Sequence, residues 1–404
     1  MSKQSETLPA ILGNAPIFEN KVNIVRPQLP SMDEMQDGVR SIMETGMVTK
    51  GKFLRAFEEA IAAHLGVKHA VALSSCTTGL MLSYQGLGLK GDVVVPSFTF
   101  MASVSSLVWA GLRPVFADVD AGTTNLSPEA AEAAITPNTS AIVAVHNFGN
   151  PAEIEALQAV ADRHGLKLVF DAAHGFGALY RGKPVGGQGN ANAFSLSPTK
   201  LLIAGEGGIV STNDDALADH LRKGREYGND GNYDSAFPGI NARMPEFNAL
   251  LGLKSLQGLE GAAERRNATV AIYRREMGKL PGIEFQQVHP EDRNSYREFS
   301  ILLNADAFGV SRDHLALALT AENIDTRKYY DPPVHRQTAY RHFAPDESLL
   351  PNTVLLAENS LSFPLWSNLE EETALGICEA VARVHQNAEA VTKALNQSRN
   401  ASAV

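Results

Sequence analysis

The sequence has few cysteines, no surplus of basic residues and no long apolar run, and each absence excludes a class of protein. The two cysteines, Cys76 and Cys378, form no C-x-x-C pair, so neither a disulfide framework nor a thiolate zinc site is available, and we expect no metal. With 35 basic and 45 acidic residues the net charge is −10, which argues against nucleic acid as a partner. No run approaches the ~20 apolar residues that span a bilayer, so we expect no membrane partner and a cytoplasmic location.

Short apolar runs alternate with helix-like segments over residues 68–170. Strands are predicted at 69–73, 93–95, 114–118, 141–145 and 166–170, and helices at 77–84, 102–110, 128–135 and 152–164. This alternation is typical of an α/β fold in which helices cover both faces of a mostly parallel sheet. In such sheets ligands bind beyond the carboxyl ends of the strands.

A chain of 404 residues is too long for one small domain and suits a large α/β domain followed by a smaller one. Residues 249–277 have the pattern of a long helix interrupted by glycines, which would link the two. A strand at 297–304 and helices at 312–320 and 371–395 follow. We predict an N-terminal arm at 1–30 (mobile or draped over a partner), a large domain at 31–250, a linking helix with a small C-terminal domain at 251–395, and a flexible tail at 396–404.

Lys200 stands out as a candidate nucleophile. It lies in the nearly uncharged turn Ser197-Pro-Thr-Lys200, which follows an apolar run ending at Ser195 and precedes a glycine cluster. Partial burial of such a lysine destabilises the ammonium form and lowers its pKa, so that more of the free amine can attack a carbonyl. The simpler alternative is a surface lysine beside a glycine turn.

Asp171 is a candidate partner for a cationic group of a ligand. It directly follows the predicted strand at 166–170 and precedes the residues Ala-Ala-His174-Gly. Burying a carboxylate without a partner costs roughly several kcal/mol, so we expect one, and the alternative role is a helix cap. His174 alone is weak evidence, because lone histidines in turns are usually structural.

Two further stretches could complete a site for a flat, phosphorylated ligand. Residues 74–79, Ser-Ser-Cys-Thr-Thr-Gly, lie between a strand and a helix, where hydroxyls and free amides form either an anion site or a simple helix cap. Residues 96–100, Pro-Ser-Phe-Thr-Phe, carry aromatic rings that could cover a flat ligand or pack in the core. Together with a lysine and a carboxylate, these are the groups that pyridoxal phosphate requires.

Several segments also match a known family: Gly46–Gly51, Pro96–Phe100, Pro114–Asp118, His146–Pro151, Asp171–His174, Ser195–Gly208, Asn241–Met244 and Pro333–His335. With them the chain resembles, from about residue 24 to residue 384, the DegT/DnrJ/EryC1/StrS family of sugar aminotransferases. The resemblance implies a fold-type I pyridoxal-phosphate enzyme, with a mostly parallel seven-stranded sheet flanked by helices and a smaller C-terminal α+β domain. One branch of the family has histidine in place of the lysine and dehydrates sugars, so Lys200 favours transamination.

By this resemblance, three residues would act directly on the cofactor. Lys200 would hold it covalently and shuttle the proton, Asp171 would pair with its pyridine nitrogen and keep that nitrogen protonated, and Phe100 would stack on its ring. His174 stands where the family usually has glutamine, and we treat it as a variant residue near the cofactor.

The same resemblance implies that two subunits hold the cofactor's phosphate. Cys76, Thr77 and Ser195 would bind it from one chain and Asn241 from the other, which predicts a homodimer with shared active sites. Cys76 replaces a glycine that is usual in the family. Because the backbone amide is kept, phosphate binding need not suffer from the change.

The reaction implied is transfer of an amino group from glutamate or glutamine to a keto-sugar, with a nucleotide-linked keto-deoxysugar as the acceptor. Tyr330 and His335 would lie on the acceptor side, or would only pack in a proline-rich turn. Two alternatives stay open: an aminotransferase for keto-inositols in aminocyclitol pathways, and a regulator that binds the cofactor without turnover. A nicotinamide enzyme is disfavoured, because Gly205-Glu-Gly-Gly208 lacks the G-x-G-x-x-G spacing.

Overall fold

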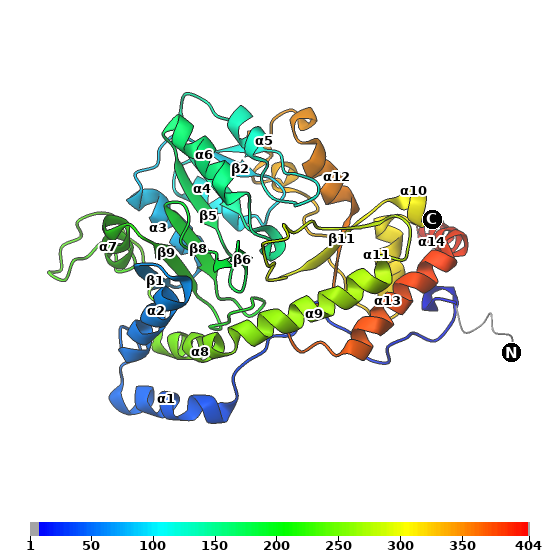
Figure 1. Ribbon diagram of the computed structural model, residues 1–404, viewed down its shortest axis with the longest axis horizontal. Helices are drawn as coiled ribbons and strands as arrows, with labels where there is room; N and C mark the ends of the chain where they lie inside the picture. Colours follow the sequence, from blue (N-terminus) through cyan, green and yellow to red (C-terminus); the bar gives the residue numbers. More distant parts are fainter. Residues whose placement is uncertain (1–7, 403–404) are drawn as a thin grey trace.

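The computed structural model describes residues 8–402; residues 1–7 of the expected arm and residues 403–404 of the expected tail lie outside the described residues. Figure 1 shows the arrangement of the elements. The helices are α1 (Met32–Thr45), α2 (Lys52–Leu65), α3 (Cys76–Gly86), α4 (Ala102–Trp109), α5 (Pro128–Ala133), α6 (Ile154–His164), α7 (Asp215–Gly224), α8 (Glu246–Gln257), α9 (Leu259–Met277), α10 (Ala305–Phe308), α11 (Arg312–Ala321), α12 (Pro351–Asn359), α13 (Glu371–Gln386) and α14 (Ala388–Ser402). The strands are β1 (His69–Leu73), β2 (Asp92–Pro96), β3 (Arg113–Ala117), β4 (Thr139–Val145), β5 (Lys167–Asp171), β6 (Leu179–Tyr180), β7 (Lys183–Pro184), β8 (Ala191–Ser195), β9 (Gly208–Thr212), β10 (Ile283–Phe285), β11 (Phe299–Leu303) and β12 (Ser360–Phe363).

The large sheet has seven strands in the order β1-β9-β8-β5-β4-β2-β3. β9 is antiparallel to β1 and to β8, whereas the pairs from β8 through β3 are parallel. The predicted mostly parallel sheet is therefore confirmed. At the end of the central strand β5, Asp171 lies in register with Val145 of β4 and Ala193 of β8, so it stands in the middle of the sheet's carboxyl edge.

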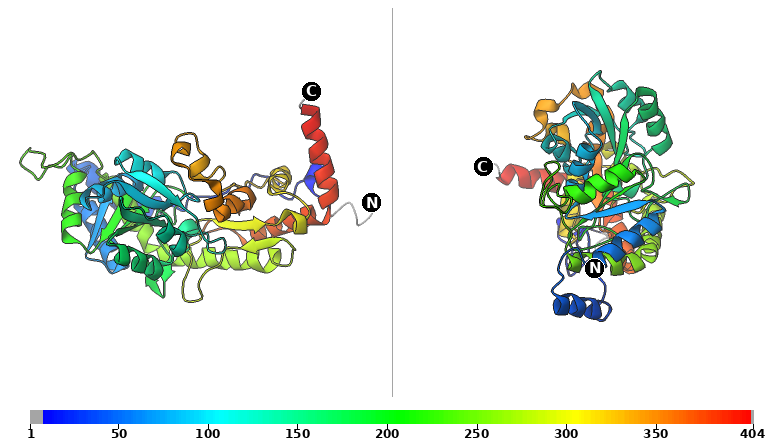
Figure 2. Two further views of the ribbon diagram at one scale, coloured as in Figure 1. Left: turned by 90° about the horizontal axis from the view of Figure 1, so that it is seen from above. Right: turned by 90° about the vertical axis from the view of Figure 1, so that its left-hand side faces the viewer.

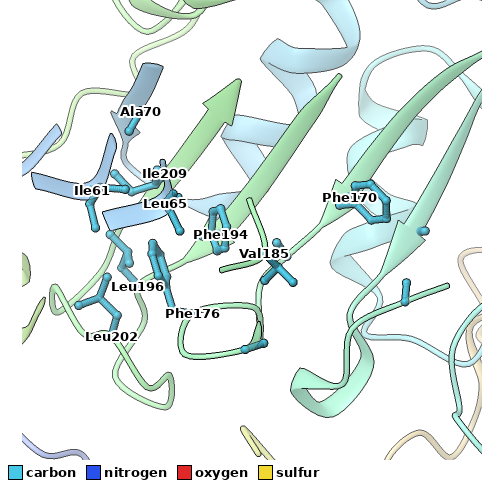
Figure 3. Close-up of a cluster of buried hydrophobic side chains, with 14 of the residues drawn as sticks. Ile61, Leu65, Ala70, Phe170, Phe176, Val185, Phe194, Leu196, Leu202 and Ile209 are labelled. Atoms are coloured by element: carbon cyan, nitrogen blue, oxygen red, sulfur yellow. The ribbon is translucent and has the colours of Figure 1, made fainter. Parts of the chain in front are cut away.

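Helix α2 covers one face of this sheet, and its sequence explains why. Leu54, Phe57, Ile61 and Leu65 recur every three or four residues, and all four are buried in the core. Figure 3 shows Ile61 and Leu65 among side chains that the sheet contributes to the same cluster. Gly66 ends the helix in a left-handed conformation with a φ of 66°, which glycine adopts at low cost.

Helix α9 connects the large sheet to a second hydrophobic core (Figure 1). Gly258 separates α9 from α8, which confirms the predicted long helix with a glycine interruption. The second core surrounds the antiparallel sheet β10-β11-β12 and includes Tyr273 of α9, Leu315 of α11 and Ile377 of α13. This core therefore assembles mainly from the C-terminal third of the chain.

The described part of the N-terminal arm packs on the second core rather than extending away from it. The Glu322 carboxylate accepts hydrogen bonds from the backbone amides of Ala10 (2.7 Å) and Ile17 (2.8 Å). Val22 then pairs with Ile324 as an isolated bridge and is itself buried. These contacts fix residues 10–22 to the end of α11.

The predicted single helix at 371–395 is wrong in one respect, because the chain forms two helices there. The side-chain amide of Asn387 donates to the Arg383 carbonyl (2.8 Å) at the end of α13, and α14 begins at the next residue. Helix α14 continues to Ser402, so the described residues of the expected tail are helical. Figure 2 shows α14 projecting from the body of the molecule.

Candidate active site

The carboxyl edge of the large sheet brings the predicted phosphate-binding residues together. Gly208, the first residue of β9, lies in register with Ser195 of β8 on one side and Leu73 of β1 on the other. The chain leaves β1 after Leu73 and enters α3 at Cys76. Residues 74–79 and Ser195, separated by more than a hundred positions in the sequence, therefore flank the same glycine.

The N-terminus of α3 faces this junction and is closely packed against it. Ser75 caps the helix by accepting a hydrogen bond from the Thr78 amide (3.1 Å), so the predicted cap is present. A Cβ atom on Gly208 would come within 2.4 Å of the Cys76 nitrogen, so only glycine fits here. The amides of Cys76 and Thr77 belong to the first turn of α3, where helical amides lack intrahelical partners and attract anions.

Asp171 is a buried carboxylate (4 % exposed) held by neutral groups. Its Oδ2 accepts from the Ser103 hydroxyl (2.6 Å), and its Oδ1 accepts from the Ala173 amide (3.1 Å) and the more distant Cys76 thiol (3.8 Å). Burial raises the pKa of Asp171, while the bonds from Ser103 and Ala173 act in the opposite direction. Within residues 8–402 no cation lies at ion-pair distance from this carboxylate, so it is suited to a cationic group of a ligand.

Lys200 lies in the turn after β8, with its backbone amide bonded to the Ser197 carbonyl (3.0 Å). Burial lowers the pKa of Lys200 to about 8, and the positive charge of Arg297 acts in the same direction. Glu298, Cys76 and Asp171 act against this shift. A lysine with this pKa has a substantial fraction of free amine near neutral pH, as its predicted role requires.

His174 follows Asp171 in the turn beyond β5 and has an unused ring nitrogen. Its Nδ1 is buried and has no hydrogen-bond partner among the described residues. Burial lowers the pKa of His174 well below the usual histidine range, and the nearby charges of Lys200 and Arg297 add to that effect. A neutral imidazole with a free nitrogen can bond to a ligand atom.

Phe100 and Asn241 are both exposed at the edge of the site. Phe100 is 52 % exposed and lies in the loop that leads to Ser103, whose amide donates to the Phe100 carbonyl (3.2 Å). Asn241 precedes Ala242, whose carbonyl accepts from the Ser74 amide (2.8 Å) beside the N-terminus of α3. The Phe100 ring is thus free to cover a ligand, and Asn241 is free to contact another molecule.

Tyr330 and His335 occupy different environments. Tyr330 is buried between aromatic rings, edge-on to Phe98 (5.4 Å between centroids) and stacked on Phe148 (5.6 Å). Both ring nitrogens of His335 are engaged, Nδ1 by the Ser97 hydroxyl (2.7 Å) and Nε2 by a Glu347 carboxylate oxygen (3.1 Å). The surroundings of His335 match the alternative that the sequence left open, a residue that packs in the proline-rich turn.

Sequence reasoning missed three residues of the site. Ser103 holds the Asp171 carboxylate, and its position one helical turn after Thr99 in a hydroxyl-rich segment was an available signal. Arg297 and Glu298 form a buried ion pair directly before β11, and both influence the pKa of Lys200. Two adjacent opposite charges before an apolar strand are a weak signal, because such pairs usually lie at the surface.

Membrane-spanning helices and clusters of metal-binding side chains are both absent from the described residues. In residues 8–402 no helix is long and apolar enough to cross a membrane. In the same described part of the chain, no group of three or more His, Cys, Asp or Glu side chains could hold a metal ion.

Comparisons with known proteins show that this chain is a transaminase. The chain belongs to the DegT/DnrJ/EryC1/StrS aminotransferase family, whose model matches residues 31–382. It is 36 % identical over 368 residues to dTDP-3-amino-3,4,6-trideoxy-alpha-D-glucose transaminase of Streptomyces venezuelae, covering 88 % of this chain and 96 % of that protein. It is 34 % identical to GDP-perosamine synthase of Caulobacter vibrioides, covering 81 % and 89 % of the two chains.

A solved structure of a similar protein has the same fold as this chain. DesI, crystallised in the presence of its TDP-sugar product, superposes with a TM-score of 0.88 at 34 % identity, over 97 % of this chain and 98 % of that one. The fold-type I architecture implied by the sequence is therefore confirmed.

The residues of the site fit pyridoxal phosphate, the cofactor of this family. The Asp171 carboxylate has only neutral donors, and the Nδ1 of His174 has no partner among the described residues. The first turn of α3, whose amides lack intrahelical partners, lies against Gly208 beside Ser195. A protonated ring nitrogen, a polar ring substituent and a phosphate would each satisfy one of these features. Lys200, with its lowered pKa, would be the amine for a covalent link.

Proposed function

We propose that this transaminase uses pyridoxal phosphate to move an amino group from glutamate or glutamine to the keto group of a nucleotide-linked keto-deoxysugar. The observation that carries the proposal is the combination of Lys200, with a pKa lowered to about 8, and the buried carboxylate of Asp171 without a cationic partner. The sugar acceptor is supported by relatives named for dTDP-linked and GDP-linked amino sugars.

Asp171 and Lys200 would divide the chemistry between them. When bound, the cofactor supplies a conjugated ring that takes up the electron pair left on the donor's α carbon. Asp171 would hold a proton on the ring nitrogen, which keeps the ring electron-poor. Lys200 would first hold the cofactor covalently and, once displaced by the donor amine, its Nζ would take the proton from the donor's α carbon.

Binding and orientation would fall to the residues around this pair. The first-turn amides at Cys76 and Thr77 and the Ser195 hydroxyl would bind the phosphate, because they converge beside Gly208. Phe100 would cover the ring face, and His174 would contact the cofactor through its unused Nδ1.

A homodimer would complete the site, with Asn241 of each chain reaching the phosphate held by the other. The support is that the surface exposes large apolar side chains, as a shared interface requires, among them Met43, Met47, Val48, Phe100 and Met101. Asn241 is exposed as well, although its neighbour Ala242 is fully buried.

On the acceptor side we propose Tyr330 as a residue that borders the sugar and His335 as one that holds the loop in place. Tyr330 lies close enough to Asp171 and Glu298 for their charges to raise its pKa further than burial does alone. His335 is fixed by Ser97 and Glu347, so its effect on the acceptor would act through the position of residues 330–335.

The test is a half-reaction followed by mapping of the covalent link. The purified protein is loaded with pyridoxal phosphate, and glutamate or glutamine should shift its absorbance to that of the aminated cofactor. Borohydride reduction before the donor is added should tag the peptide that contains Lys200. A protein that stays colourless, or a tag on another lysine, would contradict the proposal, and Lys200→Ala should abolish turnover.

The acceptor that the enzyme uses distinguishes the proposed sugar aminotransferase from an aminocyclitol aminotransferase. Keto-sugar nucleotides and scyllo-inosose are offered in parallel to the aminated enzyme, and the mass of the product is recorded. Turnover only with scyllo-inosose would replace the keto-sugar in the proposal while leaving the transaminase assignment intact.

A further inference from the structure

Arg297 presents an unoccupied hydrogen-bonding edge inside the site. It is 7 % exposed, its Nη1 pairs with the Glu298 carboxylate, and its buried Nε has no hydrogen-bond partner among the described residues. In residues 8–402 no hydrogen bond to its Nη2 is found either. Nε and Nη2 together form one of the two edges with which a guanidinium binds a carboxylate in a bidentate manner.

Two other arginines of this chain bind a carboxylate through their Nε and Nη2 atoms. Arg113 donates from Nε and Nη2 to the two carboxylate oxygens of Asp92, at 2.7 and 2.9 Å. Arg163 uses the same two atoms for Glu132, at 3.2 and 2.8 Å. At Arg297 this edge is left open although the side chain is buried, where an unmade hydrogen bond is costly.

The loop that carries Arg297 is fixed from several directions. The Arg297 amide donates to the Phe148 carbonyl (2.9 Å), and the preceding Tyr296 adopts a left-handed backbone with a φ of 48°. Arg266 donates to the Tyr296 carbonyl (3.1 Å), and the Ser295 hydroxyl donates to the His174 carbonyl (2.7 Å). A non-glycine residue keeps such a backbone only where its surroundings enforce it, so the guanidinium is held in place in advance.

The charge of this guanidinium acts on the Lys200 amine, and the loop that carries it contacts His174 through Ser295. Among the charged neighbours that act on the pKa of Lys200, Arg297 has the largest effect, and it also lowers the pKa of His174. The groups that oppose it around Lys200 are Glu298, Cys76 and Asp171. Arg297 is thus the buried cation with the strongest effect on the amine that the donor's α carbon must reach.

We propose that Arg297 binds the α-carboxylate of the amino donor through its Nε/Nη2 edge and that Glu298 serves as the resident counter-charge on the opposite edge. The inference rests on the proposed function and deepens it. A carboxylate is favoured over a phosphate because the donor's carboxylate and amine are attached to the same carbon, whereas the diphosphate of a sugar nucleotide is several bonds from the keto carbon. A buried cation whose charge acts on Lys200 therefore recognises the donor.

Substitution of Glu298 should change donor binding in the opposite direction to substitution of Arg297. Its negative charge pairs with Arg297 and competes with an incoming carboxylate for the same guanidinium. Removing the positive charge should weaken donor binding, and removing the negative charge should strengthen it. A pair that only supports the fold would make both variants worse.

The experiment compares Arg297→Gln, Arg297→Lys and Glu298→Gln in the cofactor-loaded enzyme. Glutarate, which has the donor's carboxylates and no amine, is titrated by calorimetry, and the KM for glutamate is measured in the half-reaction. We expect Arg297→Gln to weaken glutarate binding by about tenfold or more, Arg297→Lys to weaken it less because lysine lacks the fork, and Glu298→Gln to tighten it. The KM of the acceptor should stay unchanged.

Arg113→Gln is the matched control, because it breaks a bidentate pair with Asp92 outside the site and should leave glutarate binding unchanged. Glutarate affinity in Arg297→Gln within twofold of the wild type would overturn the inference, as would weaker binding in Glu298→Gln. Loss of pyrophosphate affinity in place of glutarate affinity would also overturn it, in favour of the acceptor's phosphates. If Arg297→Gln does not fold, the other two variants remain as the test, because Arg297→Lys should weaken glutarate binding and Glu298→Gln should tighten it.

A failure of the proposed function would look different. In that case the wild-type enzyme itself would show no absorbance change with glutamate or glutamine. A wild-type enzyme that reacts, together with an Arg297→Gln variant that binds glutarate normally, would remove only the role of Arg297.

Discussion

At the scale of single residues, the lowered pKa of Lys200 makes the site dependent on pH. Burial lowers this pKa to about 8, so the fraction of free amine grows as the pH rises and is half-maximal near that value. We expect the cofactor-free protein to capture pyridoxal phosphate faster with rising pH and to reach a plateau above about 8. Stopped-flow absorbance measures this rate, and a rise that continues to pH 10 would indicate an ordinary lysine.

The same shift affects stability. The unfolded chain has an ordinary lysine pKa near 10.5, above the folded value of about 8, so between these limits the unfolded state binds more protons. The contribution of Lys200 to the free energy of unfolding therefore rises with pH across this interval. Below about pH 8 the buried ammonium is a net cost to the cofactor-free fold.

Ser103 provides a second prediction at this scale. Its hydroxyl donates to the Asp171 carboxylate at 2.6 Å and favours the charged form, so Ser103→Ala should raise the pKa of Asp171 further. In the proposed function Asp171 is ionised and holds the ring nitrogen protonated. We therefore expect kcat to fall about tenfold and the acidic limb of the pH profile to move to higher pH.

The control for Ser103 is Ser106, a buried serine one turn later whose hydroxyl bonds to the Ser103 carbonyl (3.1 Å) and lies near the Tyr84 hydroxyl. Ser106→Ala should leave the acidic limb in place. An unshifted limb in Ser103→Ala would mean that the hydroxyl does not tune the carboxylate.

At the scale of elements, the contact between β9 and α3 would set the position of the proposed phosphate site. A Cβ on Gly208 would lie 2.3 Å from the Ser75 carbonyl carbon and 2.4 Å from the Cys76 nitrogen, so Gly208→Ala must displace the first turn of α3. We expect affinity for pyridoxal phosphate to fall by about tenfold or more as the first-turn amides move. Fluorescence titration of the cofactor-free protein measures this change.

Gly187 is a suitable control for Gly208. It is exposed, and an added Cβ would be 3.5 Å from Val67, an ordinary van der Waals contact. Gly187→Ala should retain cofactor affinity. Equal affinity in both variants would show that the position of α3 does not matter for binding.

At the scale of the whole molecule, the proposed shared site predicts complementation between two inactive chains. Lys200→Ala lacks the nucleophile but keeps Asn241, and Asn241→Ala keeps Lys200, so a mixed dimer contains one intact site of two. Dimers with two different tags, purified over both, should have about half of the wild-type activity per dimer.

The parent dimers are the controls for complementation, and each should be strongly impaired. Mixed dimers no more active than the two parents would place Asn241 in its own chain's site. A monomer in sedimentation experiments with full activity would remove the shared site altogether.

The sequence by itself determined the architecture of the large sheet and indicated Lys200 and Asp171 as candidate site residues. Short apolar runs alternating with helical patterns are typical of strands buried on both faces, so the parallel sheet could be predicted. Phe57, Ile61 and Leu65 at helical spacing, followed by Gly66, likewise defined α2 and its end. Asp171 was recognisable as a carboxylate at the end of an apolar run, which calls for a partner, and Lys200 as a lone amine in a nearly uncharged turn.

The tertiary structure alone decided which distant residues meet and what pKa values result. The placement of Ser195 beside the start of α3 follows from the antiparallel insertion of β9 between β1 and β8, a long-range pairing that no local pattern encodes. Arg297 and Glu298 look like surface charges in the sequence. They are buried because the loop before β11 is tied to Phe148 and His174. Burial and charge proximity depend on the folded surroundings, so the chemistry of this site was fixed by packing between segments far apart in the chain.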